Sequence, residues 1–402
     1  MKTISFQNKK VLIRVDFNVP LNDNGQITDD TRMRGAMPTL KHILDNGGSP
    51  IVMSHLGRPQ KKLNEDGTIN KGKFTLKHLV DHLAELSGAK VHFASDCIGE
   101  EASNKAAGLQ PGEILLLENT RFHKEESKGN DDFARQLASL GDIFINDAFG
   151  TAHRAHASTT VVARFFSAEN RSFGLLMEKE LHNASKVINN PSRPLTAIIG
   201  GAKVSDKILL LDRLIEFADN IIVGGGMAYT FIKAQGGEIG KSLCEDDRLE
   251  LAKSLMTKAE DRGIKLLLPE DSIIADEFSE NAMINAADSD DIPEDWMGLD
   301  IGPEARNEFE QVIMQSKTIL WNGPMGVFEM NAFSKGTKAI ANSVAIATSK
   351  GAFSLIGGGD SVAAINQLNL ADEVSYVSTG GGAMLEFLEG KLLPGVAAIQ
   401  GD

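Results

Sequence analysis

The chain has 402 residues, of which 42% are hydrophobic and 24% are charged, and its formal net charge is −14. This length exceeds the ~250–300 residues at which a single hydrophobic core stops growing, so we expect two domains of a globular protein. The negative charge argues against general nucleic-acid binding, because that function needs a basic surface.

Targeting and membrane signals are not evident. Residues 1–10 have no apolar core of the signal-peptide kind, and no apolar run approaches the ~20 residues of a membrane span. Cys97 and Cys244 are too far apart in sequence to suggest a redox or zinc pair, so we expect reduced structural thiols. These features indicate a cytoplasmic protein with no membrane partner.

The first half of the chain alternates strands with helices and places basic side chains after the strands. Buried strands are predicted at Lys10–Val15, Pro50–Ser54, Ile114–Leu117 and Ile143–Asn146, with a helix from Arg32 to about Asn46. Residues 1–170 balance acidic and basic side chains yet hold eight of the nine histidines. The strands are followed by His55, Arg58, Arg121, His123, His153, Arg154 and His156.

Each of these basic residues has an ordinary interpretation on its own, as a solvated charge or a structural histidine. Converging from several strand ends, however, they predict a cluster that pairs with phosphate or carboxylate. A zinc site is the competing hypothesis for the histidines, but no C-x-x-C or H-E-x-x-H motif accompanies them and the arginines would repel a cation.

The second half restarts the strand and helix alternation after a connector. Apolar residues at helical spacing predict a helix from Ser172 to about Asn189. Strands are predicted near Leu195–Ile199, Asn220–Val223, Lys265–Leu268, Thr318–Trp321, Phe353–Ile356 and Val374–Val377. Strands that alternate with helices indicate an α/β fold with a doubly wound parallel sheet.

Glycine loops follow these later strands. Leu355–Ser361 reads L-I-G-G-G-D-S, and related patterns recur at Ala197–Lys207, Ile221–Phe231, Ile319–Glu329 and Val377–Phe387. In a parallel sheet such loops share the edge where α/β folds bind ligands, and a glycine turn before a helix suits phosphate. Asp360 would add an oxygen ligand for Mg²⁺. The alternative is that the glycines only allow close packing and that Asp360 is an ordinary N-cap.

Lys203 and Lys207 stand four residues apart, and we expect both on one face at the start of a helix. They follow G-G-A on the same edge as Asp360, a position suited to holding phosphate. A solvated basic face is the alternative interpretation.

Six long motifs carry a family resemblance: R-V-D-F-N-V-P, S-H-L-G-R-P, N-D-A-F-G-T-A-H-R-A-H, G-G-A-K-V-S-D-K, W-N-G-P-M-G-V-F-E and G-G-G-D-S. In this order they closely resemble the phosphoglycerate kinase family, from about Val11 to the C-terminus. The resemblance implies two similar-sized lobes, each a doubly wound, mainly parallel sheet flanked by helices. Its expected parts are a phosphoglycerate-binding domain at 1–171, an interdomain helix at 172–190, a nucleotide-binding domain at 191–388, and a segment at 389–402 that returns to the first domain.

The resemblance also implies the reaction and its site. The acyl phosphate of 1,3-bisphosphoglycerate would pass reversibly to Mg-ADP, giving 3-phosphoglycerate and Mg-ATP in glycolysis, in a monomer. The implied phosphoglycerate-binding residues are Asp16, Phe17, Asn18, Arg32, His55, Leu56, Gly57, Arg58, Arg121 and Arg154. The implied nucleotide-binding residues are Gly201, Ala202, Lys207, Gly225, Asn322, Pro324, Val327, Glu329, Gly358, Gly359, Asp360 and Ser361. The implied catalytic residues are Arg32, Lys203, Lys207 and Gly381, and Asp360 is the implied Mg²⁺ ligand.

Two departures from the family pattern are small, because Ser361 replaces a frequent threonine and Ala157 a frequent serine. Phosphoryl transfer needs mainly positioning and positive charge, and neither acceptor must lose a proton, so no general base is expected. Since the reactants bind different lobes, we expect lobe closure before transfer.

Two other functions remain open at this point. A nicotinamide-dependent dehydrogenase would need a glycine fingerprint with an acidic residue ~20 positions on, and no convincing copy is present. A phospho-ligand sensor would keep the fold without the chemistry, which the intact lysines and Arg32 speak against.

Overall fold

The computed structural model describes residues 1 and 4–401, and the chain divides into two compact units. Unit 1 comprises Met1–Leu181 and Leu392–Asp402, and unit 2 comprises His182–Lys391. The division falls within the helix α7 (Leu175–Ile188). Each unit contains a six-stranded sheet whose neighbouring strands are parallel, so the predicted α/β class is confirmed.

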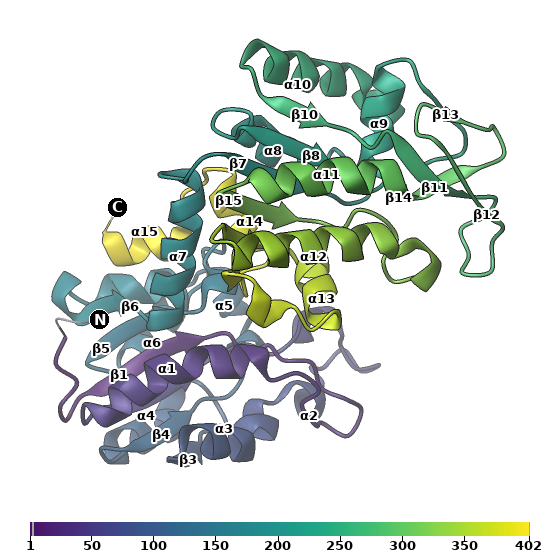
Figure 1. The fold of residues 1–402 in the computed structure, drawn as a ribbon. Coiled ribbons are helices and arrows are strands. Elements are labelled where there is room, and N and C mark those ends of the chain that lie inside the picture. The colour runs from purple at the N-terminus through teal and green to yellow at the C-terminus, as the bar shows by residue number, and fades with distance from the viewer. Residues whose placement is uncertain (2–3, 402) are drawn as a thin grey trace. The chain divides into compact units, whose positions relative to one another are not determined.

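Unit 1 is built on a sheet with the strand order β3-β4-β2-β1-β5-β6 (Figure 1). Its strands are β1 (Lys10–Val15), β2 (Ser49–Met53), β3 (Lys90–Phe93), β4 (Glu113–Leu116), β5 (Ile143–Asp147) and β6 (Arg171–Phe173). Its helices are α1 (Thr31–Asp45), α2 (Lys71–Phe74), α3 (Val80–Ser87), α4 (Gly99–Gly108), α5 (Lys124–Ser127), α6 (Asp131–Ala138), the first part of α7, and α15 (Pro394–Gln400).

The central strand β1 shows why these strands carry apolar residues on both faces. Val11 and Ile13 pack into the core on one face of the sheet, together with Leu40 of α1. Leu12, which points the other way, packs into a second core with Phe144 of β5. Since successive side chains of a strand alternate between faces, a sheet with helices on both sides needs apolar residues at nearly every position.

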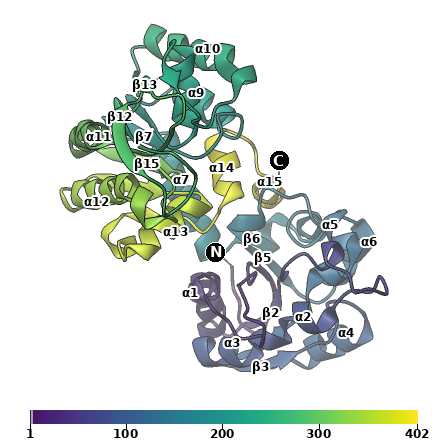
Figure 2. The same cartoon turned by 90° about the vertical axis from the view of Figure 1, so that its right-hand side faces the viewer.

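Unit 2 contains a sheet with the order β10-β8-β7-β15-β16-β17. Its strands are β7 (Leu195–Ile199), β8 (Asn220–Val223), β10 (Lys265–Leu267), β15 (Thr318–Asn322), β16 (Phe353–Ile356) and β17 (Tyr376–Val377). Its helices beyond α7 are α8 (Ile208–Leu214), α9 (Met227–Ala234), α10 (Leu249–Asp261), α11 (Pro303–Gln315), α12 (Lys335–Ser349), α13 (Gly359–Gln367) and α14 (Gly382–Leu388). Within this unit α9 packs against α10 (Figure 2).

Two smaller sheets in unit 2 were not predicted. One is antiparallel with the order β12-β11-β14, and the other pairs β13 with β9. Their strands are β9 (Glu238–Ile239), β11 (Asp271–Ala275), β12 (Ile284–Asp288), β13 (Asp291–Ile292) and β14 (Met297–Ile301). Most of β12 is exposed, so its sequence has no apolar pattern from which a strand could be predicted.

None of the helices within residues 1 and 4–401 is long and apolar enough to cross a membrane.

The carboxyl end of β5 is joined to the start of α7 through Asp147. This side chain is fully buried, and its Oδ1 accepts the backbone N–H of Met177 at 3.1 Å, while its Oδ2 is buried with no hydrogen-bond partner. Burial, opposed by the hydrogen bond to Thr39 and the backbone N–H groups of the helix, raises the pKa of Asp147 to about 6. The carboxyl group therefore binds its proton more tightly in the folded chain than in the unfolded chain.

We expect Asp147→Asn to remove a pH dependence from the stability of unit 1. Because the folded pKa of about 6 lies above the ordinary 3.8, the contribution of Asp147 to the free energy of unfolding is fully present below pH 3.8. It is lost as the pH rises through 6. Two pKa units correspond to about 3 kcal/mol. We expect denaturant unfolding to show that the free energy of unfolding of the variant, relative to the native chain, rises by about 3 kcal/mol between pH 4 and pH 7. Exposed Asp23→Asn should show no such rise. A difference that is flat across this range would contradict the assignment.

Candidate active site

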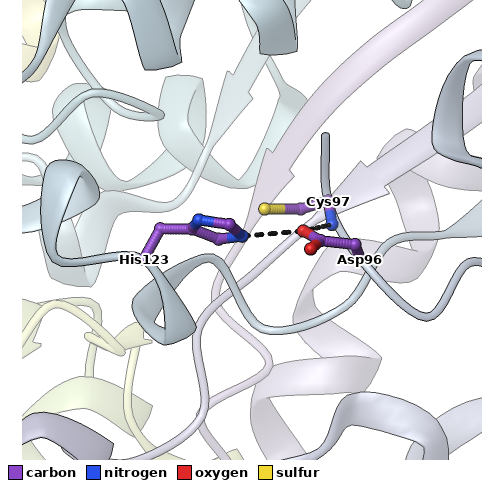
Figure 3. Close-up of side chains that lie close together, drawn as sticks. All are labelled: Asp96, Cys97 and His123. Carbon is purple, nitrogen blue, oxygen red and sulfur yellow. Dashed lines mark hydrogen bonds and ion pairs between the residues drawn. The ribbon is translucent and has the colours of Figure 1, made fainter. Parts of the chain in front are cut away.

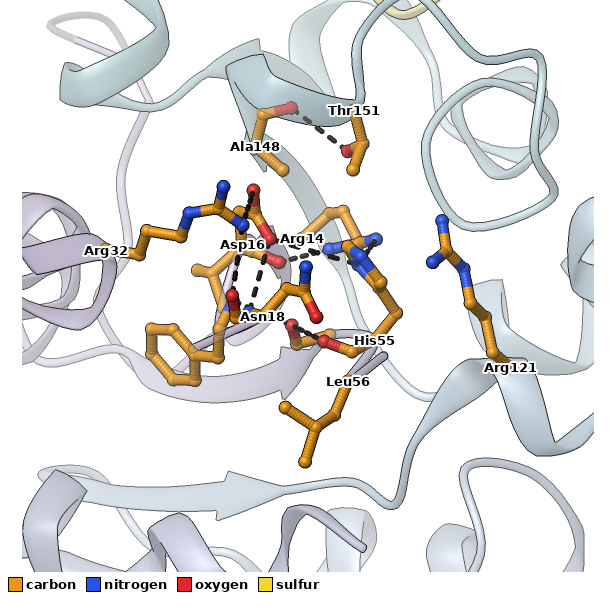
Figure 4. Close-up of polar contacts among 12 residues, drawn as sticks. Arg14, Asp16, Asn18, Arg32, His55, Leu56, Arg121, Ala148 and Thr151 are labelled. Atoms are coloured by element: carbon orange, nitrogen blue, oxygen red, sulfur yellow. Dashed lines mark hydrogen bonds and ion pairs between the residues drawn. The ribbon is translucent and has the colours of Figure 1, made fainter. Parts of the chain in front are cut away.

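Loops at the carboxyl ends of neighbouring strands bring polar side chains of unit 1 together (Figure 4). Arg32, from the first turn of α1, lies 3.3 Å from the carboxylate of Asp16 and donates to the carbonyl oxygen of Asn18 at 3.0 Å. The Asn18 side chain accepts the Gly57 N–H at 2.7 Å, and Arg121 donates to the Gly57 carbonyl oxygen at 2.8 Å. The loops after β1, β2 and β4 are thus tied to one another through the residues predicted for the site.

A buried network of hydrogen-bonded polar side chains beneath this cluster was not predicted. Arg14, near the carboxyl end of β1, has no exposed surface, and its Nε donates to Ser158 Oγ at 2.8 Å. Ser158 donates through Oγ and its backbone N–H to the two carboxylate oxygens of buried Glu126, at 2.6 and 3.0 Å. At its other end the Arg14 guanidinium lies 3.1 Å from His55 Nδ1. The one sequence signal was a charged residue inside an apolar strand.

This buried network fixes the protonation state and the tautomer of His55. Burial, followed by the positive charges of Arg14 and Arg121, lowers the pKa of His55 well below its ordinary value, so the ring is neutral near pH 7. Because Arg14 can only donate, the hydrogen-bond network assigns Nδ1 as the acceptor and Nε2 as the N–H donor.

Positive charge accumulates around the cluster. Burial and neighbouring cations lower the pKa of Arg121 to about 10, and burial together with Arg121 and Arg14 lowers the pKa of His156 to about 4. Such mutual repulsion is relieved by an anion, so the field favours a negatively charged ligand.

The other residues predicted for this site differ in their exposure. Arg58 and Arg154 are exposed. The side chains of Phe17 and Leu56 are buried in the core of unit 1, so they shape the loops rather than face solvent. The Phe17 backbone N–H, for example, donates to Ser54 Oγ at 2.8 Å.

The glycine loops of unit 2 divide into two classes. At Gly225 an added Cβ would lie 2.6 Å from the Gly201 carbonyl oxygen, so this glycine is required for two loops to touch. By contrast, an added Cβ at Gly359, on the first turn of α13, or at Gly381, before α14, would meet open space. The packing interpretation therefore holds at Gly225, whereas Gly359 leaves backbone N–H groups at a helix N-terminus accessible to a ligand.

A cleft of about 490 Å³ opens beside these loops within unit 2. The residues predicted for the nucleotide that line it are Gly201, Ala202, Gly225, Pro324, Val327, Glu329 and Asp360. The lining also includes Leu243, Phe278, Met297 and Asp300, which were not predicted. Phe278 is 61% exposed, and an exposed aromatic side chain in a polar segment is a signal that the sequence offered. Burial raises the pKa of Asp300 to about 7.

Lys207 and Asn322 lie next to the glycine turn before α13. Lys207 Nζ donates to Asn322 Oδ1, and burial lowers the pKa of Lys207 while the charge of Asp360 opposes that shift. Asn322 Nδ2 is buried with no hydrogen-bond partner and lies close to Gly358, where an added Cβ would approach it to 2.9 Å. An unused donor at this turn, beside a lysine, suits a phosphate oxygen.

The lysine prediction is wrong in one respect. Helix α8 begins at Ile208, so Lys203 and Lys207 do not lie on one face of a first helical turn. The intervening turn is held by Ser205, whose Oγ and N–H donate to the Glu245 carboxylate at 2.6 and 2.9 Å. Lys203 is consequently exposed, and Lys207 is the residue immediately before the helix.

Ser361 is buried and has a structural contact of its own. Its Oγ accepts the backbone N–H of Gly323, which ties the loop after β15 to α13. The hydroxyl group therefore supports the glycine loops from behind.

Comparisons with known proteins point to one family. The model of the family described as phosphoglycerate kinase matches residues 1–391. The chain is 54% identical to a phosphoglycerate kinase of Chloroherpeton thalassium, covering 98% of this chain and 97% of that one, and 50% identical to one of Porphyromonas gingivalis, with both chains fully covered. The solved structure of phosphoglycerate kinase from Coxiella burnetii aligns with a TM-score of 0.88 at 41% identity, covering 100% of this chain and 98% of that one.

Proposed function

The chain belongs to the phosphoglycerate kinase family, and on that premise we propose which of its residues hold each reactant and drive the transfer. The activity is phosphoryl transfer with a carboxyl group as acceptor: the acyl phosphate of 1,3-bisphosphoglycerate passes reversibly to ADP, giving 3-phosphoglycerate and ATP. Unit 1 binds the phosphoglycerate, and unit 2 binds the nucleotide.

Phosphoglycerate binding is supported most directly by the cationic cluster around His55. The ligand carries a phosphate and a carboxylate, and Arg32, Arg121 and the Nε2–H of His55 offer donors for both groups. Arg58 and Arg154, which are exposed, add positive charge that raises the local concentration of an anion. Asp16 and Asn18 hold Arg32 in place and accept hydrogen bonds from the ligand hydroxyl group.

Nucleotide binding is supported by the cleft in unit 2. Its apolar lining by Val327, Pro324 and Leu243 suits a purine base, and Glu329 offers a carboxylate for the ribose hydroxyl groups. The phosphates would lie toward Lys207, the unused amide N–H of Asn322 and the N–H groups at Gly359.

Magnesium is the implied metal, and the residues fit it. Asp360 is exposed on the first turn of α13, lines the cleft, and offers a carboxylate oxygen, the ligand type that Mg²⁺ prefers. A bound Mg²⁺ would neutralise charge on the nucleotide phosphates. Around it, Lys207 supplies a second positive charge from the protein.

The transfer needs positioning rather than proton removal. A terminal oxygen of ADP attacks the acyl phosphorus, the bond from that phosphorus to the acyl oxygen breaks, and the carboxylate leaves with the electron pair. Charge on the moving group is spread over three oxygens, which Arg32 from unit 1 and Lys203 and Lys207 from unit 2 stabilise, with the N–H groups after Gly381. Because the reactants are held by different units, we propose that the units close before transfer and exclude water.

The direct test is a coupled assay of ATP formation from enzymatically generated 1,3-bisphosphoglycerate and ADP. We expect turnover with ADP and magnesium and none when either reactant is omitted. A chain that binds both ligands yet forms no ATP would be a sensor rather than an enzyme, and the proposal would fail.

Asp360→Ala is expected to weaken nucleotide binding only in the presence of magnesium. The substitution removes the proposed metal ligand but leaves the apolar part of the cleft intact. Calorimetric titration with ADP, with and without magnesium, measures the difference, and exposed Asp372→Ala serves as the control. Equal losses under both conditions would remove Asp360 as the metal ligand.

Location and assembly are proposals as well. A relative from Arabidopsis thaliana that is 50% identical bears the name "Phosphoglycerate kinase 3, cytosolic", and we propose that this chain also works in the cytoplasm, as a monomer.

A further inference from the structure

A cluster of three potential metal ligands lies apart from the residues proposed above. Within the described residues, Asp96, Cys97 and His123 form the group whose donor atoms converge, with one carboxylate oxygen, the thiol sulfur and one ring nitrogen all within 4.8 Å of one another (Figure 3). In a tetrahedral site, ligand atoms at about 2.0–2.3 Å from a zinc ion lie about 3.3–3.8 Å from one another. Side-chain shifts of up to about 1 Å would therefore place all three donor atoms on one ion.

The fold holds these side chains together from two separate loops. Asp96 and Cys97 lie between β3 and α4, and His123 lies between β4 and α5. Since β3 and β4 are parallel neighbours, both loops leave the same edge of the sheet.

The ligand side chains are already oriented. His123 Nε2 lies 2.7 Å from Asp96 Oδ1, and the His123 ring packs on Phe133 with the ring centroids 5.1 Å apart. The Cys97 backbone N–H donates to the same Asp96 oxygen at 2.6 Å. Little conformational freedom would be lost when an ion binds.

The combination of donors selects the metal. Magnesium and calcium prefer oxygen ligands, whereas thiolate and imidazole together favour zinc and similar transition metals. Cys97 is fully buried, while the side chains of His123 and Asp96 are 26% and 46% exposed. The cluster is therefore closed on its sulfur side and open to solvent on the other, which leaves room for an ion to enter and for water as a fourth ligand.

We propose that Asp96, Cys97 and His123 form a binding site for Zn²⁺ or a similar divalent transition metal, with three protein ligands and one water. The ion replaces the proton shared by His123 and Asp96, and both this proton and that of the Cys97 thiol are released to solvent. On this proposal Cys97 and His123 hold the ion, in place of the structural thiol and the anion-cluster histidine expected from the sequence. An ion here would also restrain the end of the short helix Thr120–Phe122, which carries Arg121.

Cobalt provides a probe of this site, because a thiolate bound to Co²⁺ gives a charge-transfer absorption that oxygen ligands do not give. We expect the metal-free full chain, titrated with Co²⁺, to develop this band up to one ion per chain and to lose it when Zn²⁺ is added. Any Co²⁺ bound through Asp360 has no sulfur ligand and contributes no such band.

Variants distinguish a metal site from the alternative, in which His123 and Asp96 form only an ion pair next to the buried Cys97 thiol. Cys97→Ser should abolish the band, and His123→Gln and Asp96→Asn should weaken Co²⁺ binding by at least the ~10-fold that loss of even a supporting group costs. Asp96 is partly exposed, so Asp96→Asn remains informative if Cys97→Ser fails to fold by circular dichroism.

Two matched controls accompany them. Cys244→Ser removes the other cysteine, and His92→Gln breaks a histidine–carboxylate pair to Glu113 of similar length, 2.9 Å, in which no thiol takes part. Both should leave the band unchanged. A native chain without the band, a band kept by Cys97→Ser, or a band lost in Cys244→Ser would overturn the proposal.

Discussion

Arg32→Ala is expected to lower kcat by about 10²–10³, the effect of removing one charged contact made in the transition state. The side chain is 40% exposed and is held at the carboxyl edge of the unit 1 sheet by Asp16 and the Asn18 carbonyl oxygen. Arg32 is therefore positioned by an ion pair and a carbonyl contact while its side chain stays 40% exposed, which leaves its remaining N–H groups for the phosphoryl oxygens. Steady-state kinetics with saturating substrates measures the loss.

Arg34→Ala is the matched control for this experiment. Arg34 lies two residues further along the same helix, is 64% exposed, and pairs with Asp30 at 2.8 Å. Its replacement should leave kcat within about twofold, since an exposed ion pair contributes little. Arg32→Lys keeps the charge but loses the fork of donors, so a partial recovery is expected. Normal turnover of Arg32→Ala, with a folded chain, would end the assignment.

The strands of the two large sheets were predictable where they are buried on both faces. Lys10–Val15 and Leu195–Ile199 were predicted with the bounds that the structure gives them, because short runs rich in β-branched and other apolar residues are typical of buried strands. Strand β3 was missed, since it lies at the sheet edge and none of its residues is fully buried. Strand β6 was missed because its last two residues, Ser172 and Phe173, were taken as the start of the following helix.

The candidate site was predictable where residues follow the strands directly. His55, Arg121 and the glycine turn before Asp360 lie in the segments that follow β2, β4 and β16, and the parallel topology brings each set to one edge. Glu126 and Ser158 were not predictable, because their contact with Arg14 joins three distant segments and depends on packing depth. Burial that depends on distant segments cannot be predicted from the neighbouring residues in the sequence.

Arg14→Met is expected to destabilise unit 1 by about 3–5 kcal/mol, because it leaves the buried carboxylate of Glu126 without its cation. Glu126 and Arg14 are both fully buried, and Ser158 bridges them with bonds of 2.6 and 2.8 Å. Urea unfolding followed by circular dichroism measures the loss. Hydrogen exchange of peptides from β1 and β5 should localise it to unit 1, whereas Trp296 and Trp321 report on unit 2.

The double variant separates the cost of an unpaired charge from the cost of lost packing. Glu126→Gln alone leaves a buried guanidinium short of its anion, but Arg14→Met with Glu126→Gln removes both charges. We expect the double variant to be less destabilised than the sum of the single variants by about 1–3 kcal/mol. The double variant should nevertheless have a higher KM for phosphoglycerate than the native chain. The reason is that His55 has lost the Arg14 donor at Nδ1 that orients its Nε2–H toward the ligand. Additive losses would show that Arg14 and Glu126 are not coupled, and a double variant with a normal KM would show that Arg14 does not position His55.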